Sequence, residues 1–295
     1  MRVNPNPLPD LIAALGQTQQ QINLDLQQIA SGRSINSPSD NPAGAAQLVQ
    51  NADQSAQADQ FQRSLSSVQG SLQNADSTLS SVVTVLQRAI SLGVEGANGT
   101  LNASDRQQIA IEVQGIQSQL ISLANLSYQG TFVFAGTLTN TAPYVLNGAS
   151  PSGVSYVGNS EVNQITVGDH FTLQTNLPGS QLFSNPGTDV FQAVQDLITG
   201  LQTGTGITTA VNEIDNAYSY INQQRVFYGN AVNQANSQAT FLSTESTQLA
   251  QQESTIGGAD LSKVISNLVN AQTERQATLQ AVGQTQQNSL FSYIK

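Results

Sequence analysis

Cysteine and tryptophan are absent from this 295-residue chain, which holds a single histidine, His170. Without cysteine the chain forms no disulfide and carries out no thiolate chemistry. One histidine without cysteine partners makes no metal cluster, so we expect neither a metal site nor a cofactor. A Ser-His-Asp mechanism would depend on His170, and the chain lacks the Gly-X-Ser-X-Gly motif that usually accompanies such a nucleophile. We therefore expect His170 to be a surface residue.

Charge is also scarce, at 9% of residues against about 25% in an ordinary globular protein. The formal net charge is −10, and the nine lysines and arginines form no cluster. Phosphate backbones and anionic membranes are bound by clustered positive charge, so neither nucleic acid nor a membrane is an expected partner. No convergent set of titratable groups is visible, which makes an enzyme the least supported class.

Long apolar runs are missing too. No stretch is apolar enough to cross a bilayer, and the opening MRVNPNPLPD lacks the apolar core of a signal peptide. If the protein leaves the cell, we expect export without a cleaved signal peptide.

What the chain has instead is glutamine, serine, asparagine and threonine set between apolar residues at helical spacing. Both ends show this pattern. Because their polar faces carry few charges, both faces of such helices can be buried against other helices without desolvating ions. We predict an assembly interface formed by Leu8, Leu11, Leu15, Ile22, Ile29, Leu261, Ile265, Leu268, Leu279, Val282 and Leu290.

The strongest repeat lies further inside the chain. Leucines recur every seven residues at Leu65, Leu72, Leu79 and Leu86, with Phe61, Val68, Ala75, Val82 and Ala89 between them. This is a heptad with both seams filled, typical of helices that bury a shared stripe. The first helix is predicted over 8–31, and the helix that carries the leucine repeat is predicted to begin near Asn41 and to end at Gly96–Gly99. Further helices are predicted over about 105–127, capped by Ser104 or Asp105, over 189–201 and 207–255, and from Asp260 to about Ser292. Short β-branched and aromatic runs over 131–178 predict strands.

The predicted fold class is mainly α: an elongated helical bundle or coiled coil of N- and C-terminal segments, with a small β-rich inserted domain. We expect three parts, which are a terminal coiled coil (1–40 with 258–295), a helical bundle rod (41–130 with 189–257) and a β-rich insert (131–188). The termini would then lie at one end and a β tip at the other. A lone helix pair is barely stable, so residues 1–35 and 260–295 are expected to order on assembly.

A turn-rich segment, residues 32–44, separates the first two predicted helices. Asp40 suits a turn or helix cap, and Pro42 suits a first helical position. Arg33 is either solvated or paired with Asp40, and the sequence leaves both open. Three glycosylation-like sequons begin at Asn98, Asn102 and Asn125, which we interpret as chance.

The same segments resemble a known family. IASGRSINSPSDNPAGAA, at 29–46, resembles the N-terminal signature of the bacterial flagellin superfamily. Residues 97–125 resemble its following helix, and the end from 258 resembles its C-terminal helix. The proline-rich NPNPLPD departs from the family pattern. The signature residues of the first segment are Ser31, Gly32, Arg33, Ser39, Asp40 and Pro42.

The segment after the third predicted helix narrows the resemblance. Flagellins usually have an FNG-type stretch there, whereas this chain has GTFVFAG at 130–136 and TAPY at 141–144. That pattern, carried by Phe132, Phe134, Gly136 and Pro143, is similar to the branch of the superfamily that joins hook to filament. The ending SLFSYI is similar to that branch as well.

The resemblance implies a structural component of the bacterial flagellum at the hook–filament junction, an adaptor on which flagellin assembles by coiled-coil packing. It implies export through the flagellar type III channel, a structural role without catalysis, and self-association into a ring. It also implies contacts with a hook-side neighbour, with flagellin and with an export chaperone. A short flagellin that forms the filament itself is the first alternative. A secreted adhesin or tip-like binding module is the second, although it would not need the SPSDNP turn and the C-terminal stripe together.

Overall fold

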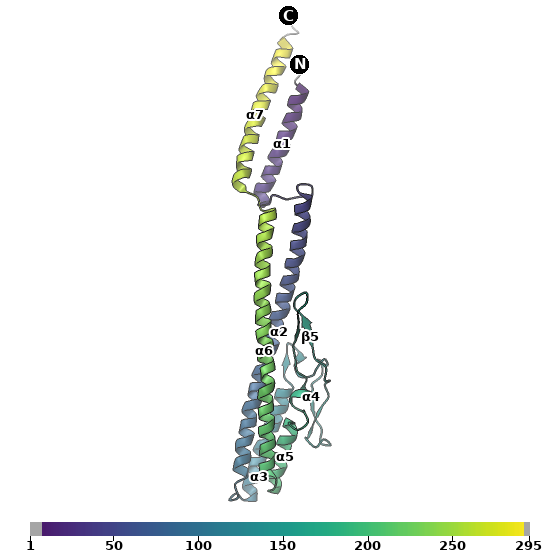
Figure 1. Cartoon of the computed structure of the whole chain (residues 1–295), viewed down its shortest axis with the longest axis vertical. Coiled ribbons are helices and arrows are strands. Elements are labelled where there is room, and N and C mark those ends of the chain that lie inside the picture. Colours follow the sequence, from purple (N-terminus) through teal and green to yellow (C-terminus); the bar gives the residue numbers. More distant parts are fainter. Residues whose placement is uncertain (1–7, 292–295) are drawn as a thin grey trace. The chain divides into compact units, whose positions relative to one another are not determined.

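The computed structural model describes residues 8–291, with side chains described as far as residue 285. Its helices are α1 (Leu8–Ser31), α2 (Pro42–Gly96), α3 (Ala103–Ala124), α4 (Gly179–Leu182), α5 (Val190–Thr203), α6 (Ile207–Gly257) and α7 (Leu261–Phe291) (Figure 1). The first helix and the start of the second lie where the sequence predicts them. The short α4 was not predicted.

The strands form three antiparallel hairpins, each of two short strands. β1 (Ser127–Tyr128) pairs with β2 (Thr131–Phe132), β3 (Tyr144–Leu146) with β4 (Val154–Tyr156), and β5 (Gln164–Thr166) with β6 (Thr172–Gln174). The central pairs of the two longer hairpins are Val145 with Ser155 and Ile165 with Leu173. The mainly α fold with a small β part is confirmed.

The chain divides into two compact units. Unit 1 comprises residues 1–57 and 244–295, and unit 2 comprises residues 58–243. The boundary falls within two helices, so the first part of α2 and the last part of α6 belong to unit 1 and the rest of both helices belongs to unit 2. The division into coiled coil, rod and insert stays a prediction.

The core of unit 2 is built on the heptad of α2. Leu72, Leu79 and Leu86 are fully buried, and they share one hydrophobic cluster with residues of α3, α5 and α6. Burying each leucine contributes about 1.5–3 kcal/mol as an upper figure. An ion pair from Arg225 Nε to Asp76 Oδ1, 2.9 Å long, links α6 to α2 beside this core. The heptad prediction is confirmed.

The start of α3 corrects one prediction. Neither Ser104 nor Asp105 caps this helix, because it begins at Ala103. Asn102 has an extended backbone, and its Oδ1 accepts a hydrogen bond from the Asp105 backbone N at 2.9 Å. Asparagine is as good a cap as serine or aspartate, so the local sequence offers three candidates, and the helix start selects the first.

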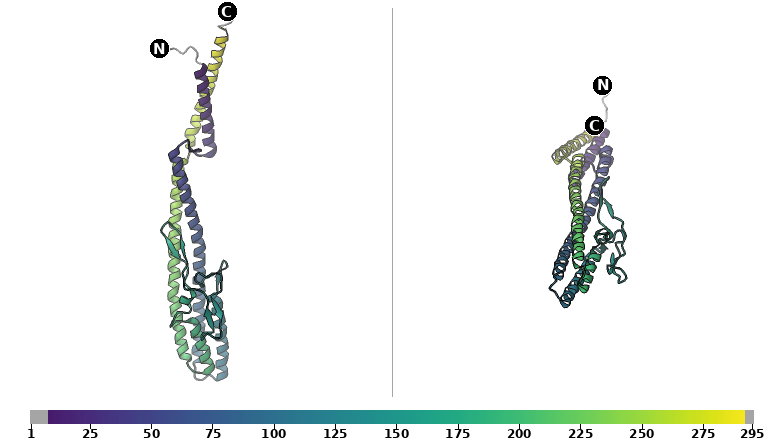
Figure 2. Two further views of the ribbon diagram at one scale, coloured as in Figure 1. Left: turned by 90° about the vertical axis from the view of Figure 1, so that its right-hand side faces the viewer. Right: turned by 60° about the horizontal axis from the view of Figure 1, so that its bottom comes forward.

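The hairpins correct a second expectation. They lie along the side of the unit 2 helices and form no tip at the end of that bundle (Figure 2). Gln238 of α6 donates from Nε2 to the Val167 backbone O at 2.9 Å, and the Leu177 backbone N donates to the Tyr228 hydroxyl at 3.2 Å. A sideways position lets the aromatic residues of this region join the helical core, which an end-on tip would leave exposed.

In unit 1, α1 and α7 pack side by side (Figures 1 and 2). The end of α1 lies next to the start of α7, because Arg33 and Gly258 form an antiparallel bridge. The two helices therefore run in opposite directions. In the part of the chain that the structure describes, no helix is both long enough and apolar enough to cross a membrane.

Candidate assembly surface

The turn before α2 is organised by Asp40. Its Oδ2 accepts hydrogen bonds from the backbone N of Asn36 at 2.9 Å and of Ser37 at 2.8 Å, and the Ser37 hydroxyl donates to Oδ1 at 3.0 Å. These bonds to the charged form, the one from Asn36 first, hold the pKa of Asp40 below its usual value. The turn role predicted for Asp40 is confirmed, and Pro42 is the first residue of α2, as expected.

Arg33 pairs with a different partner from the one considered in the sequence. Its Nη2 lies 3.0 Å from Glu253 Oε1 on α6, so pairing with Asp40 was the wrong alternative. The reason is local, because both oxygens of Asp40 already serve its own turn. More than half of each partner's side chain is exposed, so this ion pair contributes at most about 1 kcal/mol.

Main-chain bonds hold the two connecting loops of unit 1 together. The Ser34 backbone N donates to the Gly257 backbone O at 2.7 Å, and the Ala259 backbone N donates to the Gly32 backbone O at 3.0 Å. Gly32 has φ of +69°, a conformation that a side chain would strain. Next to it, the Ser31 hydroxyl oxygen accepts from the Arg33 backbone N at 3.1 Å, while Ser39 bonds to Ser37 through their hydroxyls at 2.6 Å. Residues of the signature segment therefore form the loop between α1 and α2 and bind it to the connection between α6 and α7.

The terminal helices meet along an inner seam. Ile22 on α1 and Val264 and Ala271 on α7 are buried. Val264 and Ala271 were not singled out in the sequence. Half-buried side chains extend the seam: Leu8, Leu11, Leu15, Ile29, Leu268 and Val282.

A second set of apolar side chains points away from the seam. Ile265 and Leu279 on α7 are 50% and 47% exposed, and Leu261 is similarly exposed. The α7 residues named from the sequence therefore lie on two different faces of the helix. Spacings of three and four residues connect side chains on either face, so the spacing alone does not separate the two. Four further exposed apolar residues were missed by the sequence pattern: Ile12, Leu24, Leu26 and Val269. Leu290 lies outside the residues whose side chains are described.

One charged residue is enclosed on α1. Asp25 is 2% exposed, and its Oδ1 accepts from Gln21 Nε2 at 2.9 Å. Its Oδ2 is shielded from solvent and has no hydrogen-bond partner. An acceptor left unpaired in this way destabilises the fold by about 1–3 kcal/mol. The helical pair is therefore weaker than its apolar content alone indicates.

Replacing this carboxylate should strengthen the helix pair. We expect Asp25→Leu to raise the free energy of opening α1 by about 1–3 kcal/mol, because the unpaired oxygen is removed from the seam. Amide hydrogen exchange across residues 8–31 of the full chain measures the effect. Asn23→Leu, at an exposed position of the same helix, is the matched control. Faster exchange in Asp25→Leu than in the unaltered chain would contradict the assignment.

The motif residues of the hairpin region are structural. Phe134 is fully buried, and its ring meets Phe183 edge-on at 5.3 Å between centroids. Gly136 has φ of +70°, and its backbone O accepts from Asn163 Nδ2 at 2.9 Å. Pro143 is buried, whereas Phe132 is half-buried. These residues build the junction between hairpins and helices.

The sequon asparagines also have structural roles. Asn102 caps α3, as described above, and the Asn98 side chain accepts from the Thr100 backbone N at 3.2 Å. Asn125 bonds both main-chain groups of Tyr144: its Nδ2 donates to the Tyr144 backbone O at 2.7 Å, and its Oδ1 accepts from the backbone N at 2.8 Å. These bonds give each of the three asparagines a structural role.

Histidine, aspartate and glutamate are the residue types in this chain that could bind a metal ion through their side chains. His170 is exposed in the turn between β5 and β6. Across residues 8–291, no group of three or more histidine, aspartate or glutamate side chains is placed to hold a metal ion. The features that stand out on unit 1 are its exposed apolar residues and its amide side chains.

Two models of known protein families match parts of this sequence. The bacterial flagellin N-terminal helical region matches residues 10–139, and the bacterial flagellin C-terminal helical region matches residues 211–294. The sequence is 27% identical to flagellar hook-associated protein 3 of Escherichia coli (strain K12), over 91% of this chain and 92% of that protein. It is also 27% identical to a flagellin of Listeria innocua, over 68% of this chain and 73% of that protein.

Two crystal structures share the fold. The flagellar hook-associated protein 3 of Legionella pneumophila superposes with a TM-score of 0.65 at 16% identity, covering 71% of this chain and 98% of that one. FlgL of Bacillus cereus superposes with a TM-score of 0.60 at 22% identity, covering 70% and 99%.

Proposed function

Since this chain belongs to the bacterial flagellin family, we propose that it is a structural component of the flagellum and joins the hook to the filament. The observation that carries the proposal is the end-to-end match with hook-associated protein 3, which covers more than nine tenths of both chains. The GTFVFAG and TAPY segments, whose residues Phe134, Gly136 and Pro143 are buried in unit 2, support it.

The mechanism is ordered packing of copies through the terminal helices. The inner seam holds α1 and α7 together, while Ile265, Leu279 and the other outward apolar residues are left for neighbours. Burying such residues between copies contributes about 1.5–3 kcal/mol each at most. Few charges lie on these faces, so little ion desolvation opposes the contact. In this proposal the copies form a ring through the outward apolar residues, which are Leu261, Ile265 and Leu279 from the sequence prediction together with Ile12, Leu24, Leu26 and Val269. The buried and half-buried residues named from the sequence hold α1 to α7 within one copy.

The partners follow from the place in the flagellum. A hook-associated protein would contact the ring on one side and flagellin on the other. An export chaperone would hold the chain before secretion, and the final location is outside the cell. The role is structural, without catalysis. Expression of a surface-labelled chain in flagellated cells tests the proposal: a band at the filament base is expected, and label along the whole filament would overturn it.

A short flagellin is the second candidate, because flagellins also match this chain. Seeded growth of the purified protein in concentrated salt separates the two functions. A flagellin would elongate the seeds into filaments, whereas a junction protein should stop at a short stack.

A further inference from the structure

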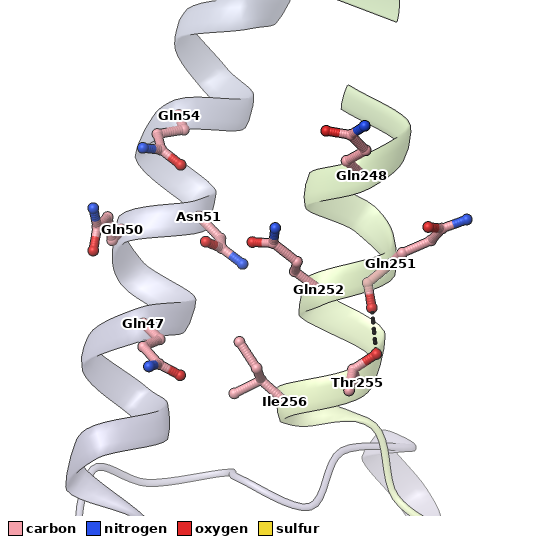
Figure 3. A pocket seen from close by; sticks show the side chains of 9 residues that line it. All are labelled: Gln47, Gln50, Asn51, Gln54, Gln248, Gln251, Gln252, Thr255 and Ile256. Atoms are coloured by element: carbon pink, nitrogen blue, oxygen red, sulfur yellow. Dashed lines mark hydrogen bonds between the residues drawn. The ribbon is translucent and has the colours of Figure 1, made fainter. Parts of the chain in front are cut away.

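A polar cleft lies in unit 1 between the first turns of α2 and the last turns of α6 (Figure 3). Its volume is about 640 Å³. The lining consists of six glutamines, one asparagine, one threonine and one isoleucine, and none of these nine residues is charged. The cleft is distinct from the apolar faces of α1 and α7, and the sequence pattern did not point to it.

The cleft holds unused hydrogen-bonding capacity. The side-chain nitrogen of Asn51 is shielded from solvent and has no hydrogen-bond partner. Figure 3 shows Asn51 and Gln252 pointing into the cleft from facing helices. The one hydrogen bond drawn there runs within α6, from the Thr255 hydroxyl to the Gln251 backbone O at 2.8 Å. Among the lining residues, therefore, no bond closes the cleft from side to side.

Few residues are buried in the parts of α2 and α6 that border the cleft. The α2 segment 42–57 buries only Gly44, and the α6 segment 244–257 buries only Leu249 and Gly257. Ile256 is the single apolar residue among those that line the cleft. Two helices that share so few apolar contacts present a surface suited to a third helix.

The chemistry restricts what that helix can be. A charged face would lose hydration against neutral amides without gaining a counter-charge. A wholly apolar face would leave Asn51 and the glutamine amides unpaired. The cleft therefore fits an uncharged helix face rich in amides, with an apolar residue to meet Ile256.

This chain carries such a face on α1. Gln17, Gln20 and Gln27 are exposed there, and Leu24, on the same side, is 44% exposed. Steps of three, four and three residues place all four side chains in one row. The row lies away from the inner seam, whose buried residues on this helix are Ile22 and Asp25.

We propose that the amide cleft between α2 and α6 receives the outer face of α1 from a second copy of this chain. Glutamine is both donor and acceptor, so the two amide surfaces can satisfy each other, and Leu24 can cover Ile256. The contact joins two different surfaces, so it is heterologous and propagates into a ring or a helical stack. The inference rests on the proposed function, since it names the contact through which junction subunits would meet.

Cross-linking tests the contact directly, because the unaltered chain has no cysteine to interfere. Full-length Gln251→Cys is mixed with full-length Gln20→Cys under conditions where sedimentation shows self-association, and a short thiol cross-linker is added. We expect a linked dimer. The matched control replaces Gln20→Cys with Gln272→Cys, an exposed position on α7. A stronger link to residue 272 than to residue 20 would overturn the choice of α1.

An isosteric charge provides the second test. Asn51→Asp places an anion in the cleft, and we expect it to raise the concentration needed for self-association at least tenfold. Gln60→Glu, an exposed position of α2 outside the cleft, should change it less than twofold. Thermal melting of both variants reports whether the fold is kept.

The outcomes separate the two proposals. A chain that forms the band at the filament base but shows neither the 251–20 link nor a defect in Asn51→Asp overturns the cleft contact alone. An unaltered chain that stays monomeric and forms no band overturns both the contact and the junction function.

Discussion

Deletion of residues 261–295 is expected to abolish filament attachment while leaving unit 2 folded. The deletion removes α7, so the inner seam residues of α1 lose their partners and the outward residues of α7 are lost to neighbours. Unit 2 keeps its own core, because the buried heptad of α2 packs on α3, α5 and α6. Motility and electron microscopy of cells that make only the shortened chain measure attachment, and circular dichroism of the purified chain measures folding.

A double substitution separates loss of assembly from loss of the helix pair. Ile265→Gln with Leu279→Gln changes two outward residues of α7 and leaves Val264 and Ala271 in the seam. We expect attachment to fall severely in this variant, with unchanged amide protection of α1. Gln272→Ser, at an exposed polar position of the same helix, should attach filaments normally. Normal attachment by the chain that lacks 261–295 would refute packing through the terminal helices.

Phe134→Ala should lower the free energy of unfolding of unit 2 by about 3–5 kcal/mol. The ring is fully buried and meets Phe183 edge-on, so truncation removes both its transfer energy and its packing. Denaturant unfolding should show a lower midpoint with an unchanged slope, which marks a stability change without a change of state. A loss of this size would be a large part of the stability of a typical domain.

Phe132→Ala is the matched control, since it lies two residues away in the same motif. Its side chain is only half-buried, so we expect a clearly smaller loss of stability. Equal losses in the two variants would mean that the motif acts as a unit and that burial of Phe134 is not the decisive feature.

Much of the fold could be predicted from spacing. A leucine every seven residues requires a helix with a buried stripe, and Leu72, Leu79 and Leu86 are indeed fully buried. The two ends of α2 could be predicted as well, because proline favours the first position of a helix and glycine interrupts one, and α2 runs from Pro42 to Gly96. The cap of α3 was missed because three neighbouring residues are chemically suitable, and only the actual helix start distinguishes them.

The assembly surface was predicted less completely. Residues spaced three or four apart on α7 fall on two adjacent faces, and the position of α1 decides that Val264 faces inward and Ile265 outward. Arg33 found its partner 220 positions away, at Glu253. No local pattern marks such a pair, because the chain between them must fold first.

The sequence by itself determined the class of this protein. Apolar spacing predicted a mainly α fold, because helix formation and turn chemistry depend on neighbouring residues. The SPSDNP turn and the GTFVFAG segment carried a resemblance to the flagellin family, which the family models show. Tertiary structure alone decided that Asp25 is enclosed without a full set of partners, that the hairpins lie beside the bundle, and that α2 and α6 leave an amide cleft between them. These features depend on which helices meet and at what rotation, and residues far apart in the chain set both.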